Sequence, residues 1–399
     1  MWWSKRVVRP EAEDDRAPTD AAGSGDHRNA FIMLGLGGAV VAAFGIAAAA
    51  AIVAPVFFAL VLTICVHPLR VALERRGVPR GIATGSVITA VTLLLLAFGY
   101  AVLVAFGQFA ALLPQFADEI VAWGADVAAW LASIGIGADG VSALFADFDP
   151  SALIAFVGSL AGGLAGVTSA LVIVFTMLLL MAMDAGYLPT LLRQTRPHRP
   201  LLVAALSGYA TNVRRYMVVT TVLGLAQGAV NWLALVLIGV PGAFIWGLLA
   251  FLCSFIPNIG YFIAIIPPII FGGLVGGWPT VIAVIVVYAL INAIIQSIIQ
   301  PRVVGNAVAL SQTITFFSVL LWAVVLGPIG AILAIPLTLL LRVVLVDANP
   351  RMAWIRPLLG ELDQTKVLIA ESEAAAKAQR AARREPTPPA LGPEPGDAT

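Results

Sequence analysis

One long charge-free run of the chain, from Tyr216 to Pro301, contains seven uncharged polar residues that could line the path of a solute. In chain order they are Gln227, Asn231, Asn258, Tyr288, Asn292, Gln296 and Gln300. The last four recur at every fourth residue, so they form one stripe along a helix, and the first two share that spacing. Amide and hydroxyl groups suit the binding of a neutral solute that carries hydroxyl or carbonyl groups. The alternative is that they join neighbouring helices, at about 0.6–2 kcal/mol for each contact.

Two motifs of proline and glycine interrupt the apolar runs, at Pro257–Gly260 and at Gly327–Gly330. Proline has no N–H and clashes with the preceding helical turn, and glycine adopts backbone angles that other residues resist. At membrane depth such backbone is tolerated only beside protein or a water-filled cavity, and paired interruptions point to a transporter's binding site. The residues expected to form re-entrant tips or gates are Pro257, Gly260, Gly327, Pro328 and Gly330. The alternative is that both motifs are ordinary extramembrane turns.

Acidic residues are absent from the sequence between Asp184 and Asp347. Carriers coupled to protons or sodium usually place carboxylates within the membrane, so this absence argues against carboxylate-based coupling in the C-terminal half. Backbone carbonyl groups can still bind sodium. The sequence also has no recognisable nucleophile–base pair, phosphate-binding loop or cluster of metal ligands. We therefore expect no catalytic residue, no metal site and no cofactor, and an enzyme is not expected.

The whole chain is too apolar for a soluble protein. Of its 399 residues, 60% are hydrophobic and 11% are charged, whereas a soluble domain has about 25% charged residues. Lipid must surround most of the chain, so the expected fold is an all-α integral membrane protein, a polytopic helical bundle with about 8 apolar segments. The formal net charge of +1 produces no basic field that would attract nucleic acid. The expected partners are the lipid bilayer and a small-molecule solute.

Changes in charge and hydropathy divide the chain into distinct parts. These are a disordered cytoplasmic tail (1–29), the first membrane helices (30–106), an extracytoplasmic amphipathic segment (107–155), a membrane helix (156–184), a basic cytoplasmic segment (185–215), a C-terminal transport core (216–345) and a cytoplasmic tail (346–399). The charge-free run 31–66 would be a helix of about 54 Å against a membrane core of about 30 Å, so we expect a helical pair. Apolar residues recur at helical spacing from Ile120 to Leu131, which predicts a helix that lies at the membrane interface or packs on its neighbours.

The positions of lysine and arginine orient these segments. Nearly all of them lie in the two tails and in the segments 70–80 and 193–215, and none lies between Arg80 and Arg193. The positive-inside rule therefore predicts a multi-pass protein of the inner (cytoplasmic) membrane with both termini in the cytoplasm. In this orientation 244–276 and 313–341 each consist of two short apolar pieces, which form either a re-entrant hairpin or two short spans.

Several short motifs follow one another in a recognisable order. They are Gly77–Arg80, Phe255–Gly260, Gln300–Gly305, Leu326–Gly330 and Ala334–Thr338. This order resembles that of the autoinducer-2 exporter (AI-2E) family over roughly residues 30–350. The resemblance implies a homo-oligomer that exports a small signalling molecule of quorum sensing, such as autoinducer-2, in some members, and cation/proton antiport in others. Members often carry a glutamate shortly before the proline corresponding to Pro301, but Ile295 and Gln296 occupy that neighbourhood here, so coupling through such a glutamate is in doubt.

Three functions are compatible with these features. The first is a permease of the AI-2E type that exports a small polar solute. The second is a sodium/proton antiporter of the same fold, which the missing intramembrane acids disfavour. The third is a non-transporting membrane scaffold that binds partners through its tails and the segment 107–155. The sequence favours the first, because the polar stripe and the interrupted segments both suit a solute path.

Overall fold

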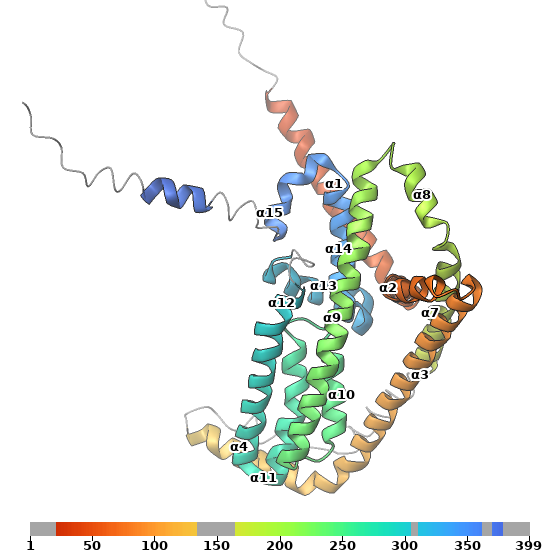
Figure 1. Cartoon of the computed structure of the whole chain (residues 1–399). Helices are drawn as coiled ribbons and strands as arrows, with labels where there is room; N and C mark the ends of the chain where they lie inside the picture. The colour runs from red at the N-terminus through yellow and green to blue at the C-terminus, as the bar shows by residue number, and fades with distance from the viewer. Residues whose placement is uncertain (1–20, 134–163, 305–309, 361–368, 378–399) are drawn as a thin grey trace, which may run out of the picture. The chain divides into compact units, whose positions relative to one another are not determined.

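The computed structural model of the chain describes residues 21–133, 164–304, 310–360 and 369–377, and every regular element in these ranges is a helix (Figure 1). By length and composition alone, five of the described helices could cross a membrane, or six if the bent pair α7 and α8 is counted as one span; two of the five, α11 and α13, contain a break. Many large apolar side chains lie on the outside, for example Val324 at 85% exposure and Leu237 at 79%. Such faces suit the hydrocarbon of a bilayer, and the chain is an all-α polytopic membrane protein.

The N-terminal apolar run forms two helices that are separated at Ala49, as its length predicts. Helix α1 (Ala21–Ala48) belongs to one compact unit, residues 1–49, and helix α2 (Ala50–Arg75) opens the second unit, residues 50–399. The predicted disordered tail 1–29 differs from the structure at its end, because α1 already begins at Ala21. No proline interrupts the chain there, and each residue added to an existing helix gains one backbone hydrogen bond. Residues 1–20 lie outside the described residues.

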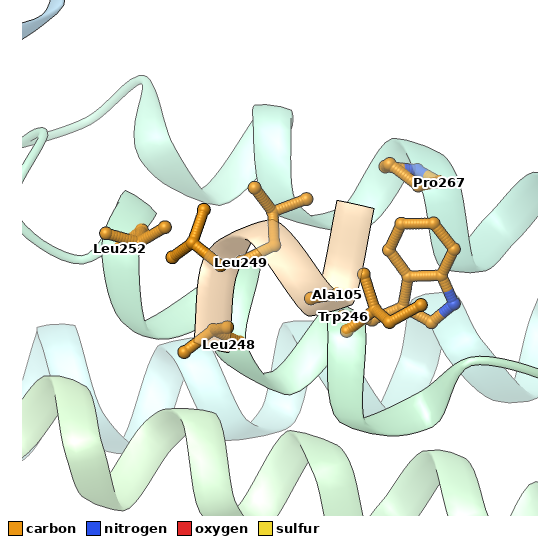
Figure 2. Close-up of a pocket in the computed structure, with 8 residues that line it drawn as sticks. Ala105, Trp246, Leu248, Leu249, Leu252 and Pro267 are labelled. Carbon is orange, nitrogen blue, oxygen red and sulfur yellow. The ribbon is translucent and has the colours of Figure 1, made fainter. Parts of the chain in front are cut away.

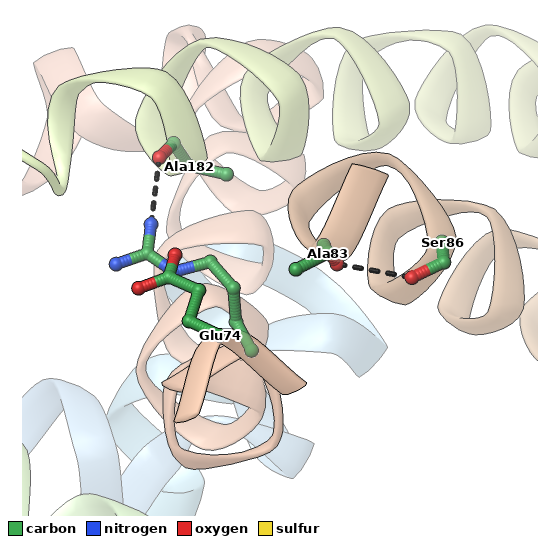
Figure 3. Close-up of polar contacts among 5 residues, drawn as sticks. Glu74, Ala83, Ser86 and Ala182 are labelled. Carbon is green, nitrogen blue, oxygen red and sulfur yellow. Dashed lines mark hydrogen bonds and ion pairs between the residues drawn. The ribbon is translucent and has the colours of Figure 1, made fainter. Parts of the chain in front are cut away.

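Helices α2, α3 (Arg80–Leu112) and α7 (Leu164–Asp184) pack around a small apolar core, which consists of Ala59, Ile88, Val174 and Leu178. Arg70 of α2 is buried, and its guanidinium donates a 3.1 Å hydrogen bond to the carbonyl of Ala182 in the last turn of α7 (Figure 3). Glu74 pairs with the same guanidinium at 3.4 Å. The cation thus meets the negative end of the α7 dipole, where positive charge is favourable. Helix α8 (Leu188–Thr195) then bends away from α7 by 59°.

Helix α9 (Pro200–Ile238) is the central element of the C-terminal half. Its 39 residues span about 58 Å. Helices α10 (Ala243–Cys253) and α11 (Gly260–Asn292) pack along it, as Figure 1 shows. The packing is close because glycines face each other: a Cβ on Gly228 would lie 2.7 Å from the carbonyl oxygen of Gly247.

Helix α11 reverses direction at Gly277. This residue has φ 60° and ψ −156°, a conformation that residues with a Cβ rarely adopt. A Cβ on Gly272 would lie 3.3 Å from Cγ2 of Val284, whereas a straight helix would separate these residues by about 18 Å. Helix α11 therefore has two antiparallel arms, 260–276 and 278–292. The second arm continues through the π-helical turn η2 (Ala293–Ile299) into α12 (Gln300–Val304).

The segment 312–342 contains a second reversal of the same kind. Helix α13 (Gln312–Ile332) is interrupted at Gly327, which has φ 70° and ψ −156°, and helix α14 (Ala334–Arg342) follows it. The indole N–H of Trp322 donates a 3.0 Å hydrogen bond to Oγ1 of Thr338, although a straight helix would place them about 24 Å apart. The two arms are therefore antiparallel. Beyond them lie the short elements η4 (Val343–Asp347), η5 (Pro350–Ile355) and α15 (Arg356–Leu359).

The predicted amphipathic helix is present and packs on the turn of α11. After α3, the 3₁₀ turn η1 (Leu113–Phe116) leads into α4 (Ala117–Ser133). The ring centroids of Trp130 and Trp278 are 5.7 Å apart, and those of Phe116 and Phe271 are 5.8 Å apart. Edge and tilted contacts of this kind stabilise aromatic pairs beyond their buried area. The remainder of the amphipathic segment, 134–155, lies outside the described residues.

Candidate functional site

The first hairpin consists of α10 and the first arm of α11, and it starts from one end of α9. Arg215, about 22 Å into α9 from its start at Pro200, donates hydrogen bonds of 3.2 and 2.9 Å to the carbonyl oxygen of Val303 in α12. The turns at Gly239 and Gly277 are each about 36–39 Å along their helices from this contact. The hairpin begins and ends at those two turns, so its base lies far from Arg215.

The tip of this hairpin stops part of the way along α9. A Cβ on Gly224 would overlap the hydroxyl of Ser254, which places the tip, residues 254–259, about 14 Å along α9 from Arg215. The turn is tight, because a Cβ on Gly260 would overlap the carbonyl of Cys253 and because Asn258 has a φ of 65°. The tip therefore ends inside the bundle rather than at either end of α9.

The second hairpin, formed by α13 and α14, meets the first at this tip. Ile256 and Ile259, on either side of Pro257 and Asn258, pack against Val319, Ala331 and Ala334 of the second hairpin. The base of the second hairpin continues into η4, which packs on α9. In Figure 1, α14 and α15 lie toward the upper part of α9, on the side of the bundle away from α4. The two interrupted segments, which are far apart in the sequence, thus come together from opposite ends of the bundle.

Buried polar atoms without hydrogen-bond partners lie deep in this bundle. Asn231 is 1% exposed and Tyr288 is 2% exposed. Among the described residues, neither the Asn231 amide nor the Tyr288 hydroxyl has a partner, and Oδ1 of Asn292 has none either. Measured along the helices from the Arg215–Val303 contact, Asn231 and Tyr288 lie at a similar depth of about 22–24 Å. Each such group lowers the free energy of unfolding by about 1–3 kcal/mol unless water or a solute completes its hydrogen bonds.

The structure separates the predicted polar residues into a deep group and a peripheral group. The deep group consists of Gln227 and Asn231 on α9 and of Tyr288 and Asn292 on the second arm of α11. Gln296 and Gln300 are half-buried and lie beyond this arm in η2 and α12, toward the Arg215–Val303 contact. Asn258 is exposed at the first tip, where its left-handed backbone is one that asparagine tolerates.

The predicted turn residues all lie at the two tips. Pro257 is half-buried and Gly260 is buried at the first, whereas at the second Gly327 is half-buried, Pro328 is exposed and Gly330 is buried. A Cβ on Gly330 would overlap the carbonyl of Trp322, just as a Cβ on Gly260 would overlap the carbonyl of Cys253. Gly260 and Gly330 are therefore required because the backbone of a neighbouring turn leaves no room for a side chain. Gly327 is required because its backbone angles are ones that other residues rarely adopt.

The region of Gln296 is widened into the π-helical turn η2. The N–H of Gln300 donates to the carbonyl of Ile295, five residues earlier. Pro301 follows directly, and its ring would clash with a carbonyl four residues before it in a regular α-helix, so the wider turn accommodates it. Single π-helical turns occur often at functional sites. The turn lies between the deep polar group and the Arg215–Val303 contact.

Three hydroxyl residues at the site are absent from the sequence-based prediction. Ser254 donates a 2.6 Å hydrogen bond to the carbonyl of Phe251 at the first tip. Ser318, 3% exposed on the first arm of the second hairpin, donates one of 2.6 Å to the carbonyl of Ile314. Thr220, also 3% exposed, lies on the buried stripe of α9. For Thr220 a signal was available, because Thr220, Gly224, Gln227 and Asn231 recur at intervals of three and four residues. Ser254 and Ser318 belong to no such repeat, so no pattern in the sequence points to them.

A separate cavity of about 140 Å³ lies between α3 and the first hairpin (Figure 2). Its lining is apolar and includes Ala105, Leu248, Leu249, Leu252 and Pro267. The indole N–H of Trp246, which also lines it, donates a 2.9 Å hydrogen bond to Pro241. This cavity offers a polar solute no compensation for lost water, so the polar group on α9 and α11 is the better candidate.

The chemistry available at the candidate site is hydrogen bonding by uncharged groups. Among the described residues, no three His, Cys, Asp or Glu side chains gather as a metal site would require. Amides, hydroxyls and the backbone of two tips can bind a neutral solute and release it without any covalent step.

Sequence comparisons place these features among known proteins. The profile described as AI-2E family transporter matches residues 32–349. The AI-2 transport protein TqsA of Escherichia coli (strain K12) is 31% identical over 318 residues, which are 79% of this chain and 91% of that protein. The putative transport protein YhhT of the same strain is 29% identical over 78% of this chain and 89% of its own length. A putative transport protein of Haemophilus influenzae is 26% identical over 84% of this chain and 97% of its own.

Proposed function

The chain belongs to the AI-2E transporter family, and from that premise we propose that it exports a small, neutral, polar solute through the bundle of α9, α10, α11, α13 and α14. The deep polar group binds the solute, and the two hairpin tips act as gates. The observation that carries this proposal is the contact of the first tip with the second hairpin, in a bundle whose helices α9 and α11 also carry buried polar atoms that have no partner among the described residues. In a membrane, interrupted helices that meet in this way are typical of solute sites.

The unpartnered groups suggest how binding is favoured. Asn231, Tyr288 and Asn292 can exchange hydrogen bonds with hydroxyl or carbonyl groups of a solute, which offsets the cost of removing both from water. Because the groups are uncharged, they do not attract an ion strongly. A neutral solute therefore fits them better than a carboxylate or a metal cation.

The gating step follows from the position of the tips. When both tips are in contact, as Ile256 and Ile259 are with the second hairpin, apolar side chains close the path between them. Movement of either hairpin would open the path to one end of α9. A solute that binds one of these arrangements better shifts the population toward it, and alternation between them moves the solute across.

The relative TqsA is named as a transporter of AI-2. We propose the same chemical class for this chain, a small hydroxylated molecule of the kind used in quorum sensing. Coupling through intramembrane carboxylates is not part of the proposal, since the sequence has none between Asp184 and Asp347. The sodium/proton antiporter therefore ranks second.

The proposed location is the inner membrane, with both termini in the cytoplasm and the Arg215–Val303 contact toward the cytoplasmic side. The basic residues of 70–80 and 193–215 support this orientation. In this orientation α4 and the turn at Gly277 lie outside, and the first hairpin enters the membrane from that side. A homo-oligomer is proposed from the family resemblance alone.

The decisive experiment is solute release from vesicles that contain the purified chain. Asn231→Leu and Asn292→Leu should abolish release of a small hydroxylated solute while yield and oligomer size stay unchanged. Thr221→Val is the matched control, because the Thr221 hydroxyl has its own partner, the carbonyl of Met217 at 2.7 Å. Normal release by the double variant would refute the site. Proton release driven by sodium in the same vesicles would favour the antiporter, and no flux of any kind would favour the scaffold.

A further inference from the structure

We propose that a basic cavity between α2 and α9 binds the phosphate group of an anionic phospholipid. The cavity has a volume of about 290 Å³ and is lined by His67, Pro68, Val71, Ala72, Arg75 and Arg214. The first five residues lie in the last turns of α2, and Arg214 lies on α9. A guanidinium group binds phosphate oxygens with two donors in one plane, so two arginines and a histidine at one cavity suit a phosphodiester.

Pro68 explains why Arg214 is held at this cavity. Proline has no N–H, so the carbonyl of Ile64, four residues earlier in α2, lacks its helical donor. The Nε of Arg214 takes that place with a 3.2 Å hydrogen bond to the Ile64 oxygen. Binding through Nε leaves the two terminal nitrogens of the guanidinium available for a ligand. The interruption in one helix thus positions a cation supplied by the other.

The acidic residue nearest to this cavity in α2 is already neutralised. Glu74 pairs with the buried Arg70 at 3.4 Å, and Arg70 also binds the carbonyl of Ala182. The charged groups that act on His67 are Arg70, Arg214 and Glu74. Within the described part of the chain, no ion pair involves Arg75 or Arg214. The cavity therefore keeps a net positive charge.

The backbone carbonyl groups at the C-terminal end of α2, which could repel an anion, accept hydrogen bonds from the following residues. The amides of Arg76, Gly77 and Val78 donate to the carbonyls of Ala72, Glu74 and Leu73 at 3.0–3.3 Å. Gly77 has a φ of 87°, the left-handed conformation with which helices commonly end. These hydrogen bonds satisfy carbonyls at the negative end of the helix.

The position of the cavity favours a lipid over free phosphate. His67 directly follows the charge-free run 31–66 and Arg75 belongs to the basic segment 70–80. The cavity therefore lies where an apolar segment changes to a basic one, as is expected at the edge of a hydrocarbon core. Its walls include the apolar side chains of Pro68, Val71 and Ala72, and the neighbouring Leu69 is 54% exposed. A phospholipid can place its phosphate at the arginines and its acyl chains along this apolar surface.

The test uses the purified full chain in detergent, titrated with phosphatidylglycerol or with phosphatidylcholine of the same acyl chains. Bound lipid is counted by native mass spectrometry, and the midpoint of thermal unfolding is followed in parallel. We expect phosphatidylglycerol to bind more tightly and to raise the midpoint. Arg75→Gln should weaken phosphatidylglycerol binding about fivefold, which corresponds to the loss of one basic residue near a membrane surface.

Arg76→Gln is the matched control, because it removes the same charge one residue away from the cavity lining and should bind as the original chain does. Arg75 is exposed, so its substitution should leave folding intact even if an Arg214→Gln variant does not fold. Equal binding of the two lipids, or equal weakening in the Arg75 and Arg76 variants, would overturn the proposal. So would inorganic phosphate that displaces phosphatidylglycerol and raises the midpoint to the same extent, since the ligand would then be a free anion.

Discussion

The indole N–H of Trp322 and the hydroxyl of Thr338 form a 3.0 Å hydrogen bond across the two arms of the α13–α14 hairpin. This contact joins residues that only a reversal of the chain can bring together, and it lies beside the cluster that receives the first hairpin. If the α13–α14 hairpin moves as proposed, this bond should influence both stability and opening.

We expect Thr338→Val to lower the free energy of unfolding by about 0.5–1.5 kcal/mol, because the Trp322 N–H loses its acceptor. Thermal unfolding in detergent would measure this. Ser207→Ala is a suitable control, since the exposed Ser207 hydroxyl only donates to the carbonyl of Val203 in its own helix. An equal decrease in the free energy of unfolding in both variants would mean that the Trp322–Thr338 hydrogen bond contributes no more to stability than a hydrogen bond within one helix.

Gly277→Ala should destabilise the protein by about 1–3 kcal/mol, because φ 60° with ψ −156° is a conformation that is essentially restricted to glycine. Gly85→Ala on α3 is the control, since a Cβ there meets no atom within 4 Å and its helical backbone accepts alanine. The midpoint of thermal unfolding distinguishes the two. A Gly277 variant as stable as the Gly85 variant would contradict a sharp reversal at this residue.

Asn231→Leu should leave the protein at least as stable as before while transport is lost. The change removes two buried polar atoms that have no partner among the described residues, and it adds apolar contact inside the bundle. Unfolding midpoints and vesicle release would be measured on the same preparation. Strong destabilisation would instead show that the Asn231 amide holds the helices together.

The proposed orientation predicts which engineered cysteines react from outside. In a background with Cys65→Ala and Cys253→Ala, a cysteine at Asp126 in α4 should react with an impermeant reagent added to whole cells. A cysteine at Ala376 should react only after the membrane is opened. Both positions are exposed, so accessibility through the membrane decides the outcome. The reverse labelling pattern would mean that the chain has the opposite orientation in the membrane.

The two tips should change their accessibility together with transport. Ser254→Cys and Ile329→Cys, in the same background, place thiols at half-buried positions of the first and second tip. We expect slow reaction with a small polar reagent and a rate that the transported solute alters. Rapid labelling of both by a large impermeant reagent, unaffected by solute, would place the motifs in ordinary extramembrane turns and remove the gate.

The sequence by itself determined the class of fold, the two interruptions at Pro257–Gly260 and Gly327–Gly330, and the uncharged polar composition of the proposed path. These properties are local: Pro328 lacks an N–H wherever it lies, and the spacing of Tyr288 and Asn292 places them on one helical face in any packing. The length of the run 31–66 also predicted a division into two helices. The start of α1 at Ala21 was not predicted, because a charged segment can remain helical when it continues an existing helix.

Only the tertiary structure decided which of these local features meet. That Gly272 faces Val284, and that Ile256 and Ile259 pack against the second hairpin, depends on chain reversals whose direction no short-range pattern contains. The same holds for polar groups: Gln296 and Asn231 look alike in the sequence, but only Asn231 is enclosed without a partner among the described residues. Arg214 reaches the Ile64 carbonyl across 150 residues of chain, because burial and pairing depend on distances in space that spacing along one helix does not define.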